Sequence, residues 1–198
     1  MFWGTVVCRN YNKMGIPLLQ VLKKLENISP LKLAESWDNV GLLVEPEKNK
    51  LVSTILLTID LTEDVVDEAI DNKVQMIITY HPNIFRPMTC ITQSHWKERV
   101  IIKCIKNDIM IFSPHTSWDA MLDGVNDWLA SSLNPKSSKP IVESKEDSNV
   151  GMGRLITLET PFLLKYIIQK IKMHIGIPYV RVGLAEHKNL GKKSCTKH

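Results

Sequence analysis

The residues best suited to metal or acid–base chemistry in this sequence stand just after two apolar segments. His81 follows the apolar residues 74–79, and Asp119 lies shortly after the apolar residues 109–112. A neutral imidazole and a carboxylate are common protein ligands of divalent zinc, manganese or iron ions. The sequence therefore predicts a divalent-metal site with His81 and Asp119 as ligands. The opposing interpretation is that each is an ordinary loop or capping residue.

Three more residues that follow apolar segments are candidate site residues, and two of them admit more than one interpretation. Tyr80 precedes His81; because a phenol has a pKa of about 10 and ligates metal poorly at neutral pH, we expect a hydrogen-bond donor there. His115 is a candidate ligand, proton shuttle or partner of the Asp119 carboxylate, or it bonds within its own turn. Asp60 either lines the site or caps the helix that follows it, and the cap is the favoured interpretation.

Apolar periodicity predicts the elements that position these side chains. Strands are expected at residues 40–44, 51–59, 74–79 and 109–112, and helices at 16–25, 64–72, 96–106 and 123–133. Alternating strands and helices predict an α/β fold, a mainly parallel sheet with helices on both faces. Ligands of such sheets bind at the edge where the parallel strands end, so Asp60, His81 and Asp119 are expected to face one cleft.

Composition divides the chain into four parts. Residues 1–13 are expected to be a flexible N-terminus or a weak targeting segment, and residues 14–134 an α/β domain. Residues 135–149 contain prolines, serines and mixed charges and are predicted to be a linker. Residues 150–198 form an incomplete second α/β segment, with strands at 155–158 and 179–184, a helix at 161–175 and a basic tail.

Composition and charge exclude several functional classes. The chain has 198 residues, of which 44% are hydrophobic and 23% charged, and its net charge is +4. No run of five Lys or Arg residues occurs, so no direct nucleic-acid or membrane partner is expected. The four cysteines are far apart, which favours a reducing compartment over a disulfide framework. The apolar runs are far shorter than the roughly 20 residues of a membrane span.

Four motifs in this order resemble the Nif-three-like (Ngg-one-interacting-factor-three-like) family, in its eukaryotic form. They are residues 35–42 (ESWDNVGL), 80–87 (YHPNIFRP), 113–120 (SPHTSWDA) and 151–155 (GMGRL). Bacterial relatives are labelled GTP cyclohydrolase I type 2 homologues. The resemblance implies an α/β fold, a two-metal cleft and ring-shaped oligomers.

Carried over by motif, the resemblance assigns roles to individual residues. His81 matches the second of two adjacent metal-binding histidines, and Asp119 matches the bridging carboxylate. Tyr80 stands where the first histidine would be, and His115 matches a pocket histidine. The family's closing His-x-x-x-Glu ligands are absent from this sequence. We therefore expect a C-terminally truncated chain whose divalent metal ion is weakly bound or missing.

Two functions follow from these observations, and a third interpretation stands beside them. The chain is either a metal-dependent, hydrolase-like protein of undefined substrate or a non-enzymatic interaction protein that acts in transcriptional co-regulation. The third interpretation is a non-functional fragment with an unburied sheet edge. The resemblance also implies self-association and a cytoplasmic location, with the nucleus and the mitochondrion as alternatives.

Overall fold

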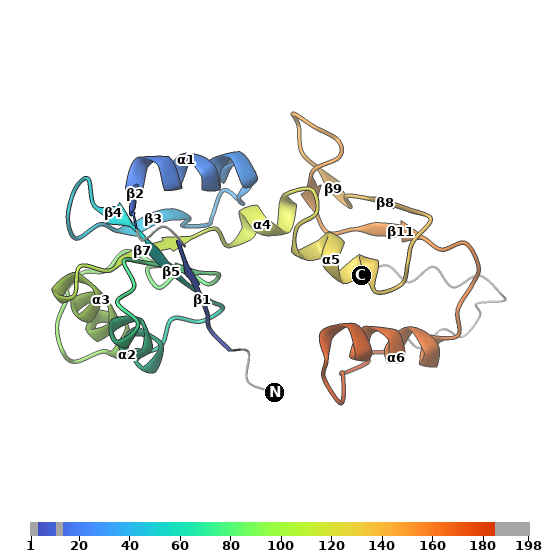
Figure 1. The fold of residues 1–198 in the computed structure, drawn as a ribbon. Helices are drawn as coiled ribbons and strands as arrows, with labels where there is room; N and C mark the ends of the chain where they lie inside the picture. Colours follow the sequence, from blue (N-terminus) through green and yellow to red (C-terminus); the bar gives the residue numbers. More distant parts are fainter. Residues whose placement is uncertain (1–3, 11–13, 185–198) are drawn as a thin grey trace. The chain divides into compact units, whose positions relative to one another are not determined.

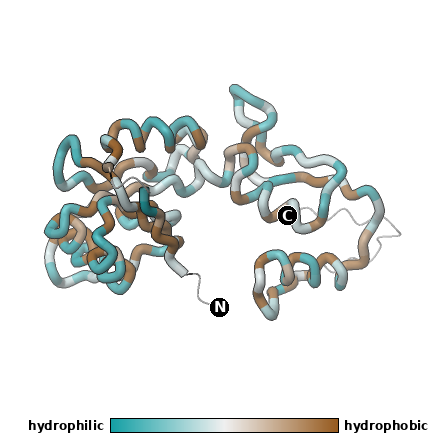
Figure 2. The backbone as a smooth tube through the Cα atoms, in the orientation of Figure 1, coloured by the Kyte–Doolittle hydropathy of each residue, from teal (hydrophilic) through white to brown (hydrophobic). Residues whose placement is uncertain are grey.

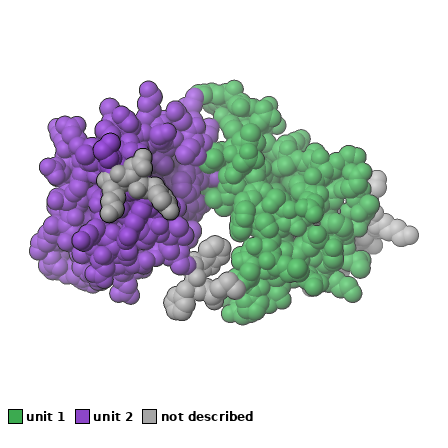
Figure 3. All heavy atoms as spheres, viewed as in Figure 1, with its two compact units in different colours: residues 1, 119–198 green, residues 2–118 purple. Residues whose placement is uncertain are grey.

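The structure is a computed structural model that describes residues 4–10 and 14–184. The chain forms two compact units, residues 2–118 and residues 119–198 together with Met1 (Figure 3). The predicted basic tail lies in residues 185–198, outside the described residues, as do residues 1–3 and 11–13 of the predicted N-terminal segment.

A five-stranded mixed sheet forms the centre of unit 2–118 (Figure 1). Its spatial order is β1 (Val6–Arg9), β5 (Thr54–Thr58), β6 (Met76–Thr79), β7 (Met110–Ser113) and β3 (Gly41–Val44). The three central strands β5, β6 and β7 are parallel, whereas β1 and β3 pair antiparallel at the two edges. The predicted α/β fold with a mainly parallel centre is confirmed.

Helices cover both faces of this sheet, as predicted. The helix α1 (Leu18–Ile28) buries Leu18 and Val21 against one face. The helices α2 (Glu63–Asp71) and α3 (Trp96–Lys106) bury their apolar sides against the other face. Hydrophobic and hydrophilic segments alternate along all three helices in Figure 2, which is the amphipathic pattern that buries one side of each helix.

The sequence missed the edge strand β1, which lies in the segment expected to be flexible. Within the described residues 4–10, Val6 pairs with Leu57 and Arg9 with Thr54 of β5. Four residues are too few for a periodic signal, so pairing with an existing strand decides the conformation. The predicted strand at 51–59 is likewise two strands, β4 (Leu51–Val52) and β5, because β4 pairs instead with β2 (Ile16–Pro17).

Unit 119–198 combines two longer helices with short strand pairs in its described part. The helices are α5 (Val125–Ser131) and α6 (Leu164–Ile175). The predicted linker 135–149 contributes β8 (Ser137–Lys139) and β9 (Val142–Glu143), which pair with β11 (Leu155–Thr157) and β10 (Gly151–Met152). The assignment of residues 14–134 and 150–198 to two domains stays a prediction.

A nearly buried arginine ties the parts of this second unit together. The Arg154 side chain is 3% exposed and pairs with Asp127 of α5 through two nitrogen–oxygen contacts. Its guanidinium also donates to the carbonyls of Gly151, Gly153 and Met121. A planar guanidinium suits such multiple bonding, and truncating it would remove a donor from a partly buried carboxylate and from three carbonyls.

One predicted element of this unit is wrong. The strand expected at residues 179–184 is an irregular segment. Tyr179 and Leu184 are exposed there, and no strand of the described residues pairs with this segment. Apolar residues alone do not form a strand without a partner ladder. In the described part of the chain, no helix is long and apolar enough to cross a membrane.

Candidate functional site

The carboxyl ends of the parallel strands β5, β6 and β7 bring four of the predicted site residues together. Asp60 follows β5, Tyr80 and His81 follow β6, and His115 follows β7. The rings of Tyr80, His81 and His115 lie with centroids 5.0 to 5.7 Å apart. The parallel register makes this convergence possible, because it aligns the ends of neighbouring strands at one edge.

Asp60 bonds to His81, and the favoured interpretation of Asp60 as a helix cap is wrong. Its Oδ1 lies 2.8 Å from His81 Nδ1. The cap of α2 is Thr62 instead, whose hydroxyl accepts from the backbone N–H of Val65. The His81 and Asp60 side chains are 50% and 70% exposed, so this pair orients an imidazole at the surface.

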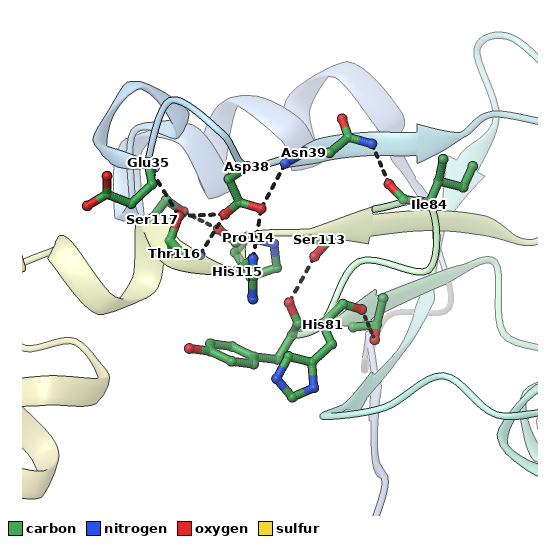
Figure 4. Close-up of polar contacts among 12 residues, drawn as sticks. Glu35, Asp38, Asn39, His81, Ile84, Ser113, Pro114, His115, Thr116 and Ser117 are labelled. Carbon is green, nitrogen blue, oxygen red and sulfur yellow. Dashed lines mark hydrogen bonds and ion pairs between the residues drawn. The ribbon is translucent and has the colours of Figure 1, made fainter. Parts of the chain in front are cut away.

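His115 belongs to a second imidazole–carboxylate pair, which is largely buried. Its Nδ1 lies 2.8 Å from Oδ1 of Asp38, whose side chain is fully buried. Figure 4 shows the imidazole of His115 extending from Asp38 toward His81. Asp38 also accepts from the backbone N–H groups of Asn39 and Thr116 and from the Thr116 hydroxyl. Four donors thus converge on one carboxylate.

These hydrogen bonds decide the ionisation of Asp38. Burial raises the pKa of a carboxyl group, but the bonds from Thr116, His115 and Asn39 outweigh that effect and lower the pKa of Asp38. The carboxylate is therefore ionised at neutral pH and bonds to the Nδ1 side of His115. A proton on Nδ1 leaves the lone pair of the neutral ring on Nε2.

The edge strand β3 places Asp38 beside His115. β3 pairs antiparallel with β7, with Gly41 opposite Ser113, so residues just before β3 lie next to those just after β7. Gly41 has a φ of +101°, and a Cβ there would lie 3.0 Å from Leu31 Cδ1. Glycine therefore permits this entry into the strand.

His115 itself has an unusual backbone conformation. Its φ is +35°, in a region that non-glycine residues rarely adopt. The helix α4 (Thr116–Ala120) begins directly after it, and Trp118 N–H donates to the His115 carbonyl. Such conformations persist where surrounding contacts over-determine them, and the bond to buried Asp38 is such a contact.

Two exposed aromatic rings border the largely buried imidazole of His115. Trp37 and Phe85 each lie with their ring centroids 6.3 Å from that of His115, and 6.1 Å from each other. All three contacts are edge-on. Together with Tyr80, these rings shield His115, whose side chain is only 16% exposed. The site therefore has an apolar wall beside its titratable groups.

Asp38 is the site residue that sequence reasoning missed. It stands in the first of the four family motifs, just before the predicted strand at residues 40–44, and it was not among the predicted site residues. The signal that could have found it is the pairing of that motif with the segment around His115. A contact between residues 77 positions apart cannot be derived from local periodicity.

Asp119, the other predicted metal ligand, lies on α4, three residues after the start of that helix. Contacts assign it to unit 119–198, and Asn126 donates to its backbone carbonyl at 3.0 Å. Its role as a ligand stays a prediction.

The donor set fits a metal ion only in part. Metal-ligating histidines usually bond their second ring nitrogen to a carboxylate, as His81 and His115 do here. Across residues 4–10 and 14–184, however, no group of three His, Cys, Asp or Glu residues is arranged to hold an ion. Catalytic zinc usually has three protein ligands. We therefore derive no reaction step through a metal from these residues.

Fold and site together define an α/β protein with two carboxylate-bonded imidazoles at the carboxyl ends of parallel strands. The sequence profile of the Duf34/NIF3 (NGG1p interacting factor 3) family matches residues 17–193. The chain therefore belongs to the Duf34/NIF3 family, which confirms the resemblance seen in the motifs.

Curated relatives and a solved structure agree with this membership. The chain is 49% identical over 162 residues to NIF3-like protein 1 of Drosophila melanogaster, covering 81% of this chain and 55% of that protein. It is 37% identical over 164 residues to the GTP cyclohydrolase 1 type 2 homolog of Clostridium perfringens, covering 83% and 62%. The crystal structure of Staphylococcus aureus hypothetical protein SA1388 matches with a TM-score of 0.74 and 26% identity, covering 84% of this chain and 67% of that one. The chain thus spans about half the length of the fly relative.

Proposed function

We propose that this chain is a hydrolase-like protein whose strand-end site binds a divalent metal ion of the zinc, manganese or iron kind. The supporting observation is the 2.8 Å contact between His81 Nδ1 and Asp60 Oδ1, which leaves Nε2 as the ring nitrogen for a metal ligand. Asp119 is the proposed second ligand. When bound, such an ion would act as a Lewis acid and lower the pKa of a coordinated water.

We propose weak metal binding because the described donor set is incomplete. His81 and Asp119 are two ligands, whereas catalytic zinc sites usually have three from the protein. The exposed fraction of His81, 50%, also leaves the position open to water. The substrate would bind beside the ring of His81, against the aromatic wall of Trp37 and Phe85.

His115 is the proposed proton carrier of the same site. The ionised carboxylate of Asp38 bonds to Nδ1 and orients the ring, which leaves Nε2 as the proton acceptor. Its ring centroid lies 5.7 Å from that of His81. A substrate group held at His81 is therefore within reach of His115, directly or through one water.

Titration of the metal-free chain with Zn²⁺ and Mn²⁺, followed by calorimetry, tests this function. We expect weak binding that His81→Ala lowers by more than about tenfold and Asp60→Asn by about 10- to 100-fold. His174→Ala is the matched control, since His174 lies on α6 and bonds to the Trp128 carbonyl. An equal loss in the control would contradict the proposed location. Two tightly held ions per purified chain would contradict weak binding.

The second candidate is a non-enzymatic interaction protein that acts in transcriptional co-regulation. The incomplete donor set favours it, because binding a protein partner needs no metal. Under this function, capture of a defined partner survives His81→Ala and Asp119→Ala. Loss of the partner on chelation of metal would instead favour the first function.

We also propose self-association, in the cytoplasm or alternatively in the nucleus or mitochondrion. Large apolar side chains of the second unit support it: Leu163 is 70% exposed, Met173 74% and Tyr179 77%. Exposed apolar surface of this kind is typical of an interface. Sedimentation velocity of the full chain measures it, and a strictly monomeric species at high micromolar concentration would contradict it.

A further inference from the structure

A cavity of about 420 Å³ lies in unit 2–118, in the loop between β6 and α3 and at the first turn of α3. Asn83, Phe85, Arg86, His95, Lys97 and Glu98 are among its lining residues. We propose that this cavity binds an oxyanion group, a phosphate or a carboxylate, through the Asn83 amide and the cationic side chains of Arg86 and Lys97. This site is independent of metal binding at His81.

The Asn83 side chain is the first observation that points to a ligand. Asn83 is 6% exposed, and its Nδ2 is buried without a hydrogen-bond partner among the described residues. A buried amide donor is normally satisfied, as in Asn39, which donates to the Ile84 carbonyl nearby. Because the terminal torsion of asparagine is broad, the Asn83 amide can turn toward an acceptor in the cavity. The missing partner is therefore an acceptor.

The charges of the lining determine what kind of acceptor fits. Arg86 and Lys97 carry positive charge, and Lys97 Nζ lies 5.5 Å from the ring centroid of Trp96. Glu98 carries the opposing charge, held in place by hydrogen bonds from the N–H and hydroxyl of Thr92, so the lining has two cations against one carboxylate. The first turn of α3, an eleven-residue helix, adds the positive end of a helix dipole. A negatively charged oxygen acceptor fits this combination better than a neutral one.

The cavity adjoins the histidine site through one side chain. Phe85 lines the cavity, and its ring centroid lies 6.3 Å from that of His115. Asn83 also stands only two residues after His81 in the chain. An extended anionic ligand could therefore place its oxyanion in the cavity and another part beside the imidazoles.

Calorimetric titration of the full chain in EDTA-containing buffer, with inorganic phosphate in one arm and acetate in the other, tests the proposal. EDTA removes any metal that could itself bind these anions. We expect binding in at least one arm with a Kd tighter than about 10 mM, and the tighter arm identifies the group. No binding in either arm would overturn the proposal.

Three variants locate the binding. Asn83→Leu, which replaces the orphaned amide by an apolar group of similar size, should stay folded and weaken anion binding by about fivefold or more. Lys97→Met should weaken it about tenfold, whereas Lys106→Met, at the other end of α3, is the matched control and should change it less than twofold. Equal losses in the two lysine variants, or unchanged affinity in folded Asn83→Leu, would overturn the proposal.

His81→Ala separates this site from the metal site. Anion binding in EDTA should be unchanged in that variant. If metal titration fails while phosphate or acetate still binds, only the proposed metal function is wrong. If anion binding disappears with His81, the anion is held at the histidine site and the cavity proposal is wrong.

Discussion

The two imidazole–carboxylate pairs of the site have the same nitrogen–oxygen distance, 2.8 Å, but opposite surroundings. His81 and Asp60 are half or more exposed, whereas His115 is 16% exposed and Asp38 is fully buried. Water screens the first pair and competes for its hydrogen bonds, while the second pair lies among protein donors. The two pairs therefore have the same geometry, but the buried pair is expected to contribute more to the stability of the fold. The exposed pair remains accessible to a ligand.

The largest expected difference is between removal of the two carboxylates. Asp38→Ala should lower the free energy of unfolding by about 2 to 4 kcal/mol, because it leaves the donors of Asn39, Thr116 and His115 without their acceptor. Asp60→Ala should cost less than about 1 kcal/mol, as is typical of exposed pairs. Urea denaturation of both variants measures this. Similar losses would show that burial does not separate the pairs.

Removal of the imidazoles should show the same contrast on a smaller scale. His115→Ala should cost about 1 to 3 kcal/mol, because it removes one donor from a buried carboxylate and keeps an alanine at a φ of +35°. His81→Ala should stay within about 0.5 kcal/mol of the wild type. His115→Gly should recover part of the loss, since glycine adopts positive φ without strain. Thermal unfolding of the three variants is the measurement, and a glycine variant less stable than the alanine variant would contradict the role of the backbone.

Lowering the pH should reduce the stability that the ionised Asp38 carboxylate contributes to the fold. The hydrogen bonds from Thr116 and His115 overcome burial and hold the pKa of Asp38 below that of the unfolded chain, about 3.9. The stabilisation is therefore present above pH 4 and is lost as the pH falls through the native pKa. Asp38→Asn, which carries no titrating group at that position, should lose less stability than the wild type over this range. Denaturation curves at several pH values below 5 test this, and parallel losses would argue against it.

The smallest expected effect is that of salt. Wild type and Asp60→Asn should differ in free energy of unfolding by a few tenths of a kcal/mol at low salt. At 1 M salt, where the Debye length is about 3 Å, screening should remove most of this difference. The corresponding difference for Asp38→Asn should persist, because solvent ions do not reach a buried carboxylate. Urea denaturation at about 0.1 and 1 M NaCl compares them. Equal salt sensitivity would mean that Asp38 is accessible in solution.

Local patterns in the sequence predicted most of the first unit. The helix at 96–106 has the predicted bounds, and the strands β6 and β7 lie within two residues of theirs, because long apolar periods and buried strands leave a clear local signal. Two predictions failed for one common reason: β1 was not predicted, and the strand predicted at residues 179–184 does not form. A short apolar segment becomes a strand only where a neighbour offers a ladder, and that neighbour is distant in the chain.

The candidate site divides in the same way. The order of strands predicted that Asp60, His81 and Asp119 face one cleft, and the structure brings Asp60 and His81 together there with Tyr80 and His115. The bond from Asp60 to His81 was not expected, because a helix cap was the favoured interpretation of Asp60. The observed cap of α2 is Thr62, which leaves the Asp60 carboxylate to bond to His81. The role of Asp119 as a metal ligand stays a prediction.

By itself, the sequence determined the α/β class, the family motifs and the strand ends at which polar side chains gather, because all of these follow from residue types at short spacing. Only the tertiary structure decided that Asp38 is buried against His115 and that Asn83 is left without a partner. Both depend on how β3 and the loop after β6 pack against distant segments. Packing determines which polar groups are buried, and a buried polar group without a hydrogen-bond partner costs free energy of folding.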